Sequence, residues 1–142
     1  MNVAKLVVAW LVVGVVMNAL DLLVHGVALG SYYAQLTFMR QDVSPAWFVL
    51  MDFVVALVFV VVYDRLYATP TRRAGRGAAF GFWTGLLLNF PAGISMNLMF
   101  KGFPYWLAWV WIASGLVTLT IAGAVAGALY AKRAVVVKPA AI

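Results

Sequence analysis

Six polar side chains that could do chemistry interrupt otherwise apolar stretches: Asn18, Asp21, His25, Asp52, Asn89 and Asn97. Carboxyl and imidazole groups can bind protons or cations, and the amides can donate and accept hydrogen bonds. If these stretches cross a membrane, an ionised carboxylate facing lipid would cost about 2.5–3.5 kcal/mol. We therefore expect Asp21 and Asp52 to face the protein interior, where they are paired or protonated.

The spacing of these residues predicts that they meet in one layer. Asn18, Asp21 and His25 lie on one helical face, within about 60° of one another at about 100° per residue. Asp21 and His25 are four residues apart, so we expect a hydrogen bond between them. At a rise of about 1.5 Å per residue, Asp52 reaches the same depth on the next apolar stretch. Asn97 reaches that level too, while Asn89 falls near the middle of its own stretch.

Three interpretations of this layer stay open. It could be a structural hydrogen-bond network that fixes the register of the helices. It could be a site for a proton, a cation or a lipophilic small molecule, open to the outer face. It could also hold a metal through Asp21, His25 and Asp52, because one imidazole and two carboxylates suit a hard or intermediate ion. The chain has no Cys, which excludes disulfides, iron–sulfur clusters and thiolate metal sites, and the sequence indicates no particular cofactor.

The composition is that of a membrane protein. Of the 142 residues, 66% are hydrophobic and only 10% are charged, whereas soluble domains average about 45–50% apolar and about 25% charged residues. The net charge of +6 comes from Lys and Arg residues that flank the apolar stretches. This placement favours contact with anionic lipid headgroups and argues against nucleic acid as a partner.

Four apolar stretches are long enough to cross about 30 Å of hydrocarbon, which takes roughly 20 helical residues. They are residues 6–29, 46–63, 78–100 and 104–130. Their Leu, Ala and Met content favours helices, and they lack the alternation of barrel strands. We therefore expect an all-α fold in which residues 1–142 form a single four-helix transmembrane bundle.

The positive charges predict the orientation of this bundle. Lys5, the arginines of residues 65–76 and the basic residues of 132–138 would lie on one side of the membrane and carry eight charges. Arg40 and Lys101 would lie on the other side. Because positive loops are retained in the cytoplasm, both termini are expected there.

Three glycine pairs are spaced for close helix packing: Gly26/Gly30, Gly81/Gly85 and Gly123/Gly127. Such pairs let two backbones approach closely. The second and third pairs are at matching depth on antiparallel neighbours, so we expect them to pack together. Alternatively, one pair serves an oligomer or a partner subunit. The aromatic-rich residues 30–43 are expected to lie along the outer membrane interface.

One stretch carries a resemblance to known proteins. Residues 18–26 (NALDLLVHG), followed by Tyr32 and Tyr33, resemble the first helix of small bacterial four-helix membrane proteins that belong to uncharacterised families. The resemblance implies a multi-pass protein of the bacterial inner (cytoplasmic) membrane. It also implies that the Asn/Asp/His face is a shared feature, and it implies no activity.

No catalytic motif supports an enzyme. Residues 71–77 (TRRAGRG) lack P-loop spacing, there is no nucleophile elbow, and Ser114 and Thr118 are expected to bond carbonyls of their own helix. The favoured function is a non-catalytic membrane component that self-associates or serves as an accessory subunit of a larger membrane complex. The alternative is a module that binds or transports a proton, a cation or a lipophilic small molecule through the Asp/His/Asn layer. An enzyme acting on lipid or quinone has only the His/Asp pair in its favour.

Overall fold

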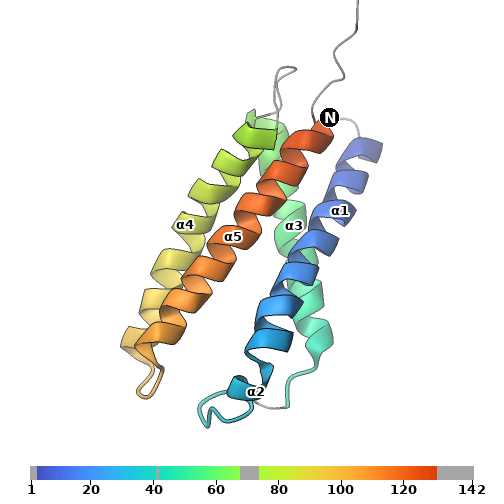
Figure 1. Ribbon diagram of the computed structural model, residues 1–142. Coiled ribbons are helices and arrows are strands. Elements are labelled where there is room, and N and C mark those ends of the chain that lie inside the picture. The colour runs from blue at the N-terminus through green and yellow to red at the C-terminus, as the bar shows by residue number, and fades with distance from the viewer. Residues whose placement is uncertain (1–2, 41, 68–73, 131–142) are drawn as a thin grey trace, which may run out of the picture.

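The computed structural model describes residues 3–40, 42–67 and 74–130, which are helical apart from short connections. Helix α1 (Val3–Asp21) continues without a break as a π-helix, η1 (Leu22–Ala28), and a short helix α2 (Gly30–Tyr33) follows. Three long helices complete the order: α3 (Pro45–Tyr67), α4 (Ala74–Met99) and α5 (Tyr105–Tyr130) (Figure 1). The described part of the chain contains no strand, so the predicted all-α fold is confirmed.

Three helical segments are long and apolar enough to cross a membrane: Val3–Ala28, Pro45–Tyr67 and Tyr105–Tyr130. They coincide with the first, second and fourth predicted spans. Helix α4 lies in the range of the third predicted span but is not among them. Its five glycines, two asparagines and internal Pro91 lower its hydropathy although it is as long as α5.

Bulky apolar side chains cover the outside of the molecule. Trp47, Leu87 and Leu98 are 62%, 73% and 78% exposed, and they belong to a much larger set of exposed aliphatic and aromatic residues. A soluble monomer rarely exposes an apolar surface of this extent to water. Lipid tails would match it, so the surface is consistent with an integral membrane protein.

The long helices form two antiparallel pairs, α1 with α3 and α4 with α5 (Figure 1). Helix α5 joins the pairs, because it packs along α4 and also contacts α1 and α3. About half of the buried residues at the junction are small or β-branched, including Ala9, Val13, Ala56, Val60 and Ala122. Side chains of this size allow three helices to approach at one place.

Helix α4 meets α5 through glycines that recur every fourth residue. The buried residues of α4 are Gly77, Gly81, Gly85 and Gly93, and no others. A Cβ atom built on Gly81 would overlap the carbonyl oxygen of Leu119 in α5. Backbones can come this close only where no side chain stands between them, as at Gly81.

The glycines singled out in the sequence fall into two groups. The structure brings Gly81 together with Gly123, whose added Cβ would crowd the Gly81 Cα, and Gly85 follows one turn further along the same contact. Gly127 belongs to the contact through Gly77, a glycine that sequence reasoning left out. Gly77 lies four residues before Gly81, and extending the spacing by one step would have found it.

The pair Gly26/Gly30 makes no helix–helix contact in the described structure, so it does not pack two helices of this chain together. The alternative role, in an oligomer or a contact with a partner subunit, stays a prediction. Gly26 is exposed, and a Cβ there would meet only Leu22 of its own helix. Gly30 has only the His25 carbonyl oxygen nearby, at 3.8 Å. The reason is local: η1 ends at Ala28, so the two glycines belong to different helical segments.

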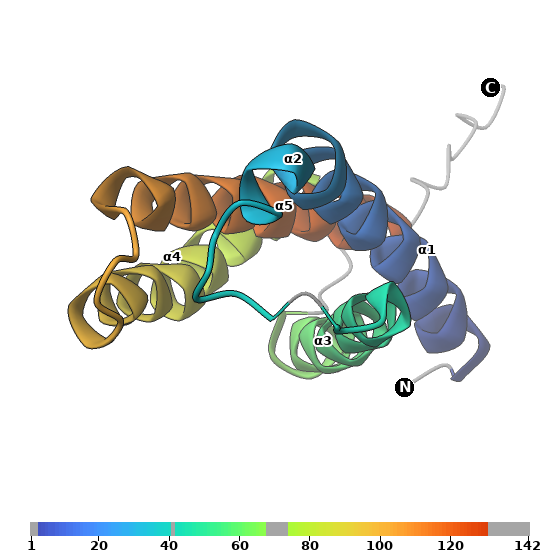
Figure 2. The same cartoon turned by 90° about the horizontal axis from the view of Figure 1, so that it is seen from below.

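Residues 30–40 fold back under the bundle and cover the start of α5 (Figure 2). The rings of Tyr32 and Trp106 have centroids 5.0 Å apart, and those of Phe38 and Phe103 are 5.6 Å apart. At the end of this segment, Arg40 Nη2 lies 2.7 Å from Asp42 Oδ2. That guanidinium holds the pKa of the Asp42 carboxyl below its ordinary value.

We predict that Gly81→Ala destabilises the fold and that Gly75→Ala does not. Ala is favoured over Gly inside a helix by about 0.5–1 kcal/mol at either position. At Gly81 the added methyl meets the backbone of α5, whereas nothing lies within 4 Å at Gly75. We expect Gly81→Ala to lower the free energy of unfolding by about 1–3 kcal/mol. Thermal unfolding in a mild detergent measures the difference, and equal stabilities for the two variants would contradict the backbone contact.

Candidate functional site

Asp21 of α1 and Asp52 of α3 line one cavity of about 210 Å³, to which all four long helices contribute. The remaining lining residues are Met17, Val55, Leu88, Asn89, Gly115, Thr118 and Leu119. Each helix therefore supplies one polar side chain to a space whose other walls are apolar. We call these four residues, Asp21, Asp52, Asn89 and Thr118, the acidic site.

A hydrogen bond links two members of the acidic site. The Thr118 hydroxyl donates to Asp21 Oδ1 over 3.2 Å. Thr118 is only 4% exposed, and among the described residues it is the one polar side chain in the buried core. The Asp21 and Asp52 carboxyl groups line the same cavity. Since an ionised carboxylate can only accept, a hydrogen bond between the two carboxyls requires a proton on one of them.

Asn89 is positioned by the same packing that joins α4 to α5. It follows Gly85 at the four-residue spacing of the glycine contact, and its Nδ2 donates to the Gly85 carbonyl over 2.9 Å. A Cβ on Gly115 of α5 would overlap the Asn89 side chain, so Gly115 provides the space that this side chain occupies. The amide is thereby fixed at the wall of the cavity.

Asn18 and Asn97 do not line the cavity, although sequence reasoning placed them in the polar layer. Asn18 Nδ2 donates to the Gly14 carbonyl of its own helix over 2.9 Å. Asn97 Nδ2 donates to the Phe103 carbonyl over 2.8 Å and so fastens the connection between α4 and α5. Both amides satisfy backbone groups, which is a common use of polar side chains in apolar surroundings.

His25 belongs to a second cluster, together with Tyr33 and Trp111. His25 Nδ1 and the Tyr33 hydroxyl are 2.7 Å apart, and Trp111 Nε1 donates to the same hydroxyl over 2.7 Å. Indole can only donate, so the Tyr33 hydroxyl accepts a hydrogen bond from Trp111 and can donate one to His25 Nδ1. Burial raises the pKa of the Tyr33 hydroxyl, which keeps that proton in place.

The expected hydrogen bond between Asp21 and His25 is not formed, and His25 pairs with Tyr33 instead. The two residues are separated by the change from α-helix to π-helix, because η1 begins immediately after Asp21. A π turn holds more residues than an α turn, so the spacing rule for an α-helix no longer applies. A metal site of Asp21, His25 and Asp52 is not supported either. Within the described residues, no group of three or more His, Cys, Asp or Glu could hold a metal ion.

Two features of the sites escaped sequence reasoning. Thr118 was expected to bond its own helix, as Ser114 does through the Trp111 carbonyl, but it reaches across to α1. Tyr33 and Trp111 are 78 residues apart, and only the folding of α2 under the bundle brings them together. The Tyr32-Tyr33 pair was visible as an aromatic signal, although it could equally have marked the membrane interface.

No protein-family model, curated protein or solved structure matches the chain.

We predict that Tyr33→Phe and Trp111→Phe are coupled in stability. Tyr33→Phe removes both hydrogen bonds of the Tyr33 hydroxyl, and Trp111→Phe removes the one that Trp111 donates. Each change leaves a half-buried partner unsatisfied, at a cost of about 1–3 kcal/mol. Because both changes break the same hydrogen bond, the double variant should lose less than the sum of the two. A coupling of about 0.5–3 kcal/mol is expected from a double-mutant cycle in detergent. Tyr105→Phe, at an exposed ring, is the matched control, and strictly additive losses would count against the cluster.

Proposed function

We propose that this protein is a four-span membrane protein that binds a proton at Asp21 and Asp52 and exchanges it for a small cation. One observation carries the proposal: two carboxyl groups from separate helices meet in a cavity that all four long helices line. This is the alternative that the sequence left open. We prefer it to a purely structural component because the geometry supplies a space next to the polar groups.

The placement of α4 beside α5 supports a fourth span. The two helices have the same length and pack together, with glycine contacts from Gly77 to Gly93. If α5 crosses the bilayer, its close partner lies at the same depth. The polar atoms of α4 do not argue against this position, since Asn89 and Asn97 both donate to backbone carbonyls of the protein.

The orientation and location follow from the charge distribution. We place both termini in the cytoplasm, because eight Lys and Arg residues belong to that side in a four-span arrangement and two to the other. Lys5 lies at the end of the bundle where α5 finishes, since its Nζ donates to the Tyr130 carbonyl over 3.4 Å. Together with the resemblance of the first helix, this topology suits a bacterial inner membrane protein.

The chemistry of the acidic site suits a proton or a monovalent cation. Two adjacent carboxylates repel each other in a poorly solvated space, so a shared proton or a bound cation stabilises the pair. Oxygen atoms of Asp21, Asp52, Asn89 and Thr118 are hard donors for such an ion. A cavity of about 210 Å³ exceeds the size of a bare metal ion, and its walls include Met17 and Leu88. An alkylammonium ion would match both the charge and the apolar walls.

We predict that the acidic site holds a titratable proton that Asp21→Asn or Asp52→Asn removes. Protonated carboxyl groups have their own carbonyl stretching band, so infrared spectra of the protein in lipid nanodiscs can be followed against pH. The wild-type band should fade as the pH rises, and both variants should lack it. Asp42→Asn, which removes an exposed carboxyl paired with Arg40, should leave it unchanged.

The cation half of the proposal is tested in the same samples. Adding tetramethylammonium should release protons from the wild type and from Asp42→Asn, but not from Asp52→Asn. A wild-type band that is absent, or equally strong in Asp21→Asn and Asp52→Asn, would overturn the proton site. Variants that simply unfold while the wild type takes up no proton would favour the structural component, either self-associating or an accessory subunit.

A further inference from the structure

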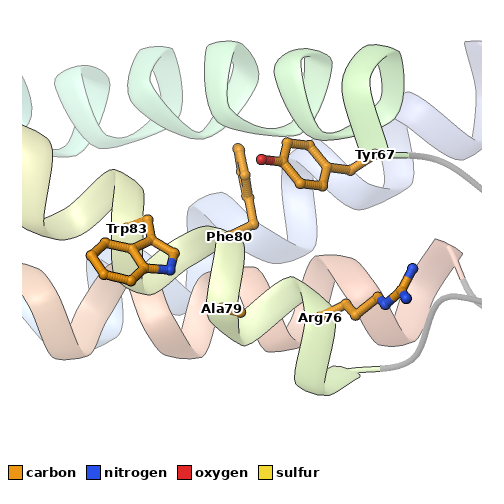
Figure 3. Close-up of a pocket in the computed structure, with 5 residues that line it drawn as sticks. All are labelled: Tyr67, Arg76, Ala79, Phe80 and Trp83. Carbon is orange, nitrogen blue, oxygen red and sulfur yellow. The ribbon is translucent and has the colours of Figure 1, made fainter.

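A second cavity lies at the Tyr67 end of α3 and shares no lining residue with the acidic site. Its volume is about 220 Å³, and it is lined by Tyr67 of α3 and by Arg76, Ala79, Phe80 and Trp83 of α4 (Figure 3). The α4 residues are spaced three or four apart, so they form one stripe along the helix. This end of the bundle also holds Lys5 and the end of α5.

The inner wall of this cavity is formed by aromatic rings that pack against one another at tilted angles. The rings of Tyr67 and Phe80 have centroids 4.8 Å apart, and Phe80 also packs against Phe59 at 4.8 Å and Tyr63 at 5.4 Å. Phe80 therefore points from α4 toward α3 and closes the inner side (Figure 3). Trp83, by contrast, is 66% exposed and forms the outer rim.

The cavity combines a cation with a path of apolar side chains. Arg76 is exposed and forms no ion pair with any residue that the structure describes. From Trp83 the exposed side of α4 continues through Leu87 and Phe90, which are 73% and 44% exposed. A ligand that fits this arrangement has a negative headgroup and a long apolar tail. Its headgroup end would lie at the depth where Trp and Tyr rings favour the membrane interface.

We infer that this cavity, defined by Tyr67, Arg76, Phe80 and Trp83, binds an anionic phospholipid of the cytoplasmic leaflet. The Arg76 guanidinium can hold the lipid phosphate through two parallel hydrogen bonds, a geometry that Lys cannot provide. The glycerol region would lie between Tyr67 and Trp83, and one acyl chain would follow Leu87 and Phe90. A free phosphate ion would use Arg76 but gain nothing from the apolar path. This proposal rests on the membrane orientation proposed above, and it is independent of proton binding at Asp21 and Asp52.

The experiment compares Arg76→Gln with Arg65→Gln. Both variants remove one positive charge at the same end of the bundle, but Arg65 does not line the cavity. Protein is released from nanodiscs of phosphatidylcholine with a minor fraction of phosphatidylglycerol, and native mass spectrometry counts the retained lipids. We expect the wild type and Arg65→Gln to retain phosphatidylglycerol in preference to phosphatidylcholine. In Arg76→Gln this preference should be about tenfold weaker.

Two further measurements test whether the bound ligand is a phospholipid. Arg76→Lys keeps the charge but not the paired hydrogen bonds, so it should fall between the wild type and Arg76→Gln. Excess inorganic phosphate should not displace the lipid, since it cannot occupy the apolar path. Equal losses in Arg76→Gln and Arg65→Gln would mean a diffuse attraction to charge and would overturn the site. Displacement by inorganic phosphate would show an anion site instead of a lipid site, and would overturn it as well.

Discussion

The close backbone contact between α4 and α5 is the constraint on which the rest of the structure depends. Inside a bilayer two apolar helices gain little from associating unless their backbones approach closely. Gly77 and Gly81 allow that approach at one end of the contact. At the other end, Gly93 leaves space for the side chain of Ile112. With α4 fixed on one face of α5, the opposite region of α5 is left for α1 and α3.

The two polar clusters inherit their geometry from this arrangement. Asn89 takes a position in the glycine series and faces Gly115, so the packing that holds the helices also directs an amide to the cavity wall. Thr118 lies one turn beyond Gly115 and meets Asp21 on α1. The same helix carries Trp111 to the Tyr33 hydroxyl. Helix α5 therefore orients side chains of both clusters, although it contributes no ionisable group to either.

Much of the helical arrangement was predictable, because it depends on local properties of the chain. Apolar runs and their lengths located the ends of the long helices to within four residues. The pairs Gly81/Gly85 and Gly123/Gly127 indicated a close antiparallel contact. Depth counting also placed Asp21 and Asp52 at one level. That count needs only the rise per residue and the direction of each helix.

The partners of the polar groups were less predictable, because they depend on rotation about each helix axis and on distant segments. An α-helical wheel places Asp21 next to His25. Because the helix changes to η1 after Asp21, His25 forms its hydrogen bond with Tyr33 instead. Asn18 and Asn97 were placed in the layer by depth alone, and their amides are used by nearby carbonyls. Nothing in the local sequence distinguishes Thr118 from Ser114. Only the approach of α1 makes the difference.

The π-helical stretch after Asp21 has a consequence for how the first helix can vary in length. A π turn is equivalent to an α-helix that has accommodated an extra residue without ending. The part of the helix before the π turn directs Asp21 toward α3 and α5. The part after it is rotated about the helix axis, so that His25 faces Tyr33. One continuous helix thus serves two sites whose orientations are set separately. A residue gained or lost within Leu22–Ala28 would re-aim the imidazole and leave the carboxyl pair where it is.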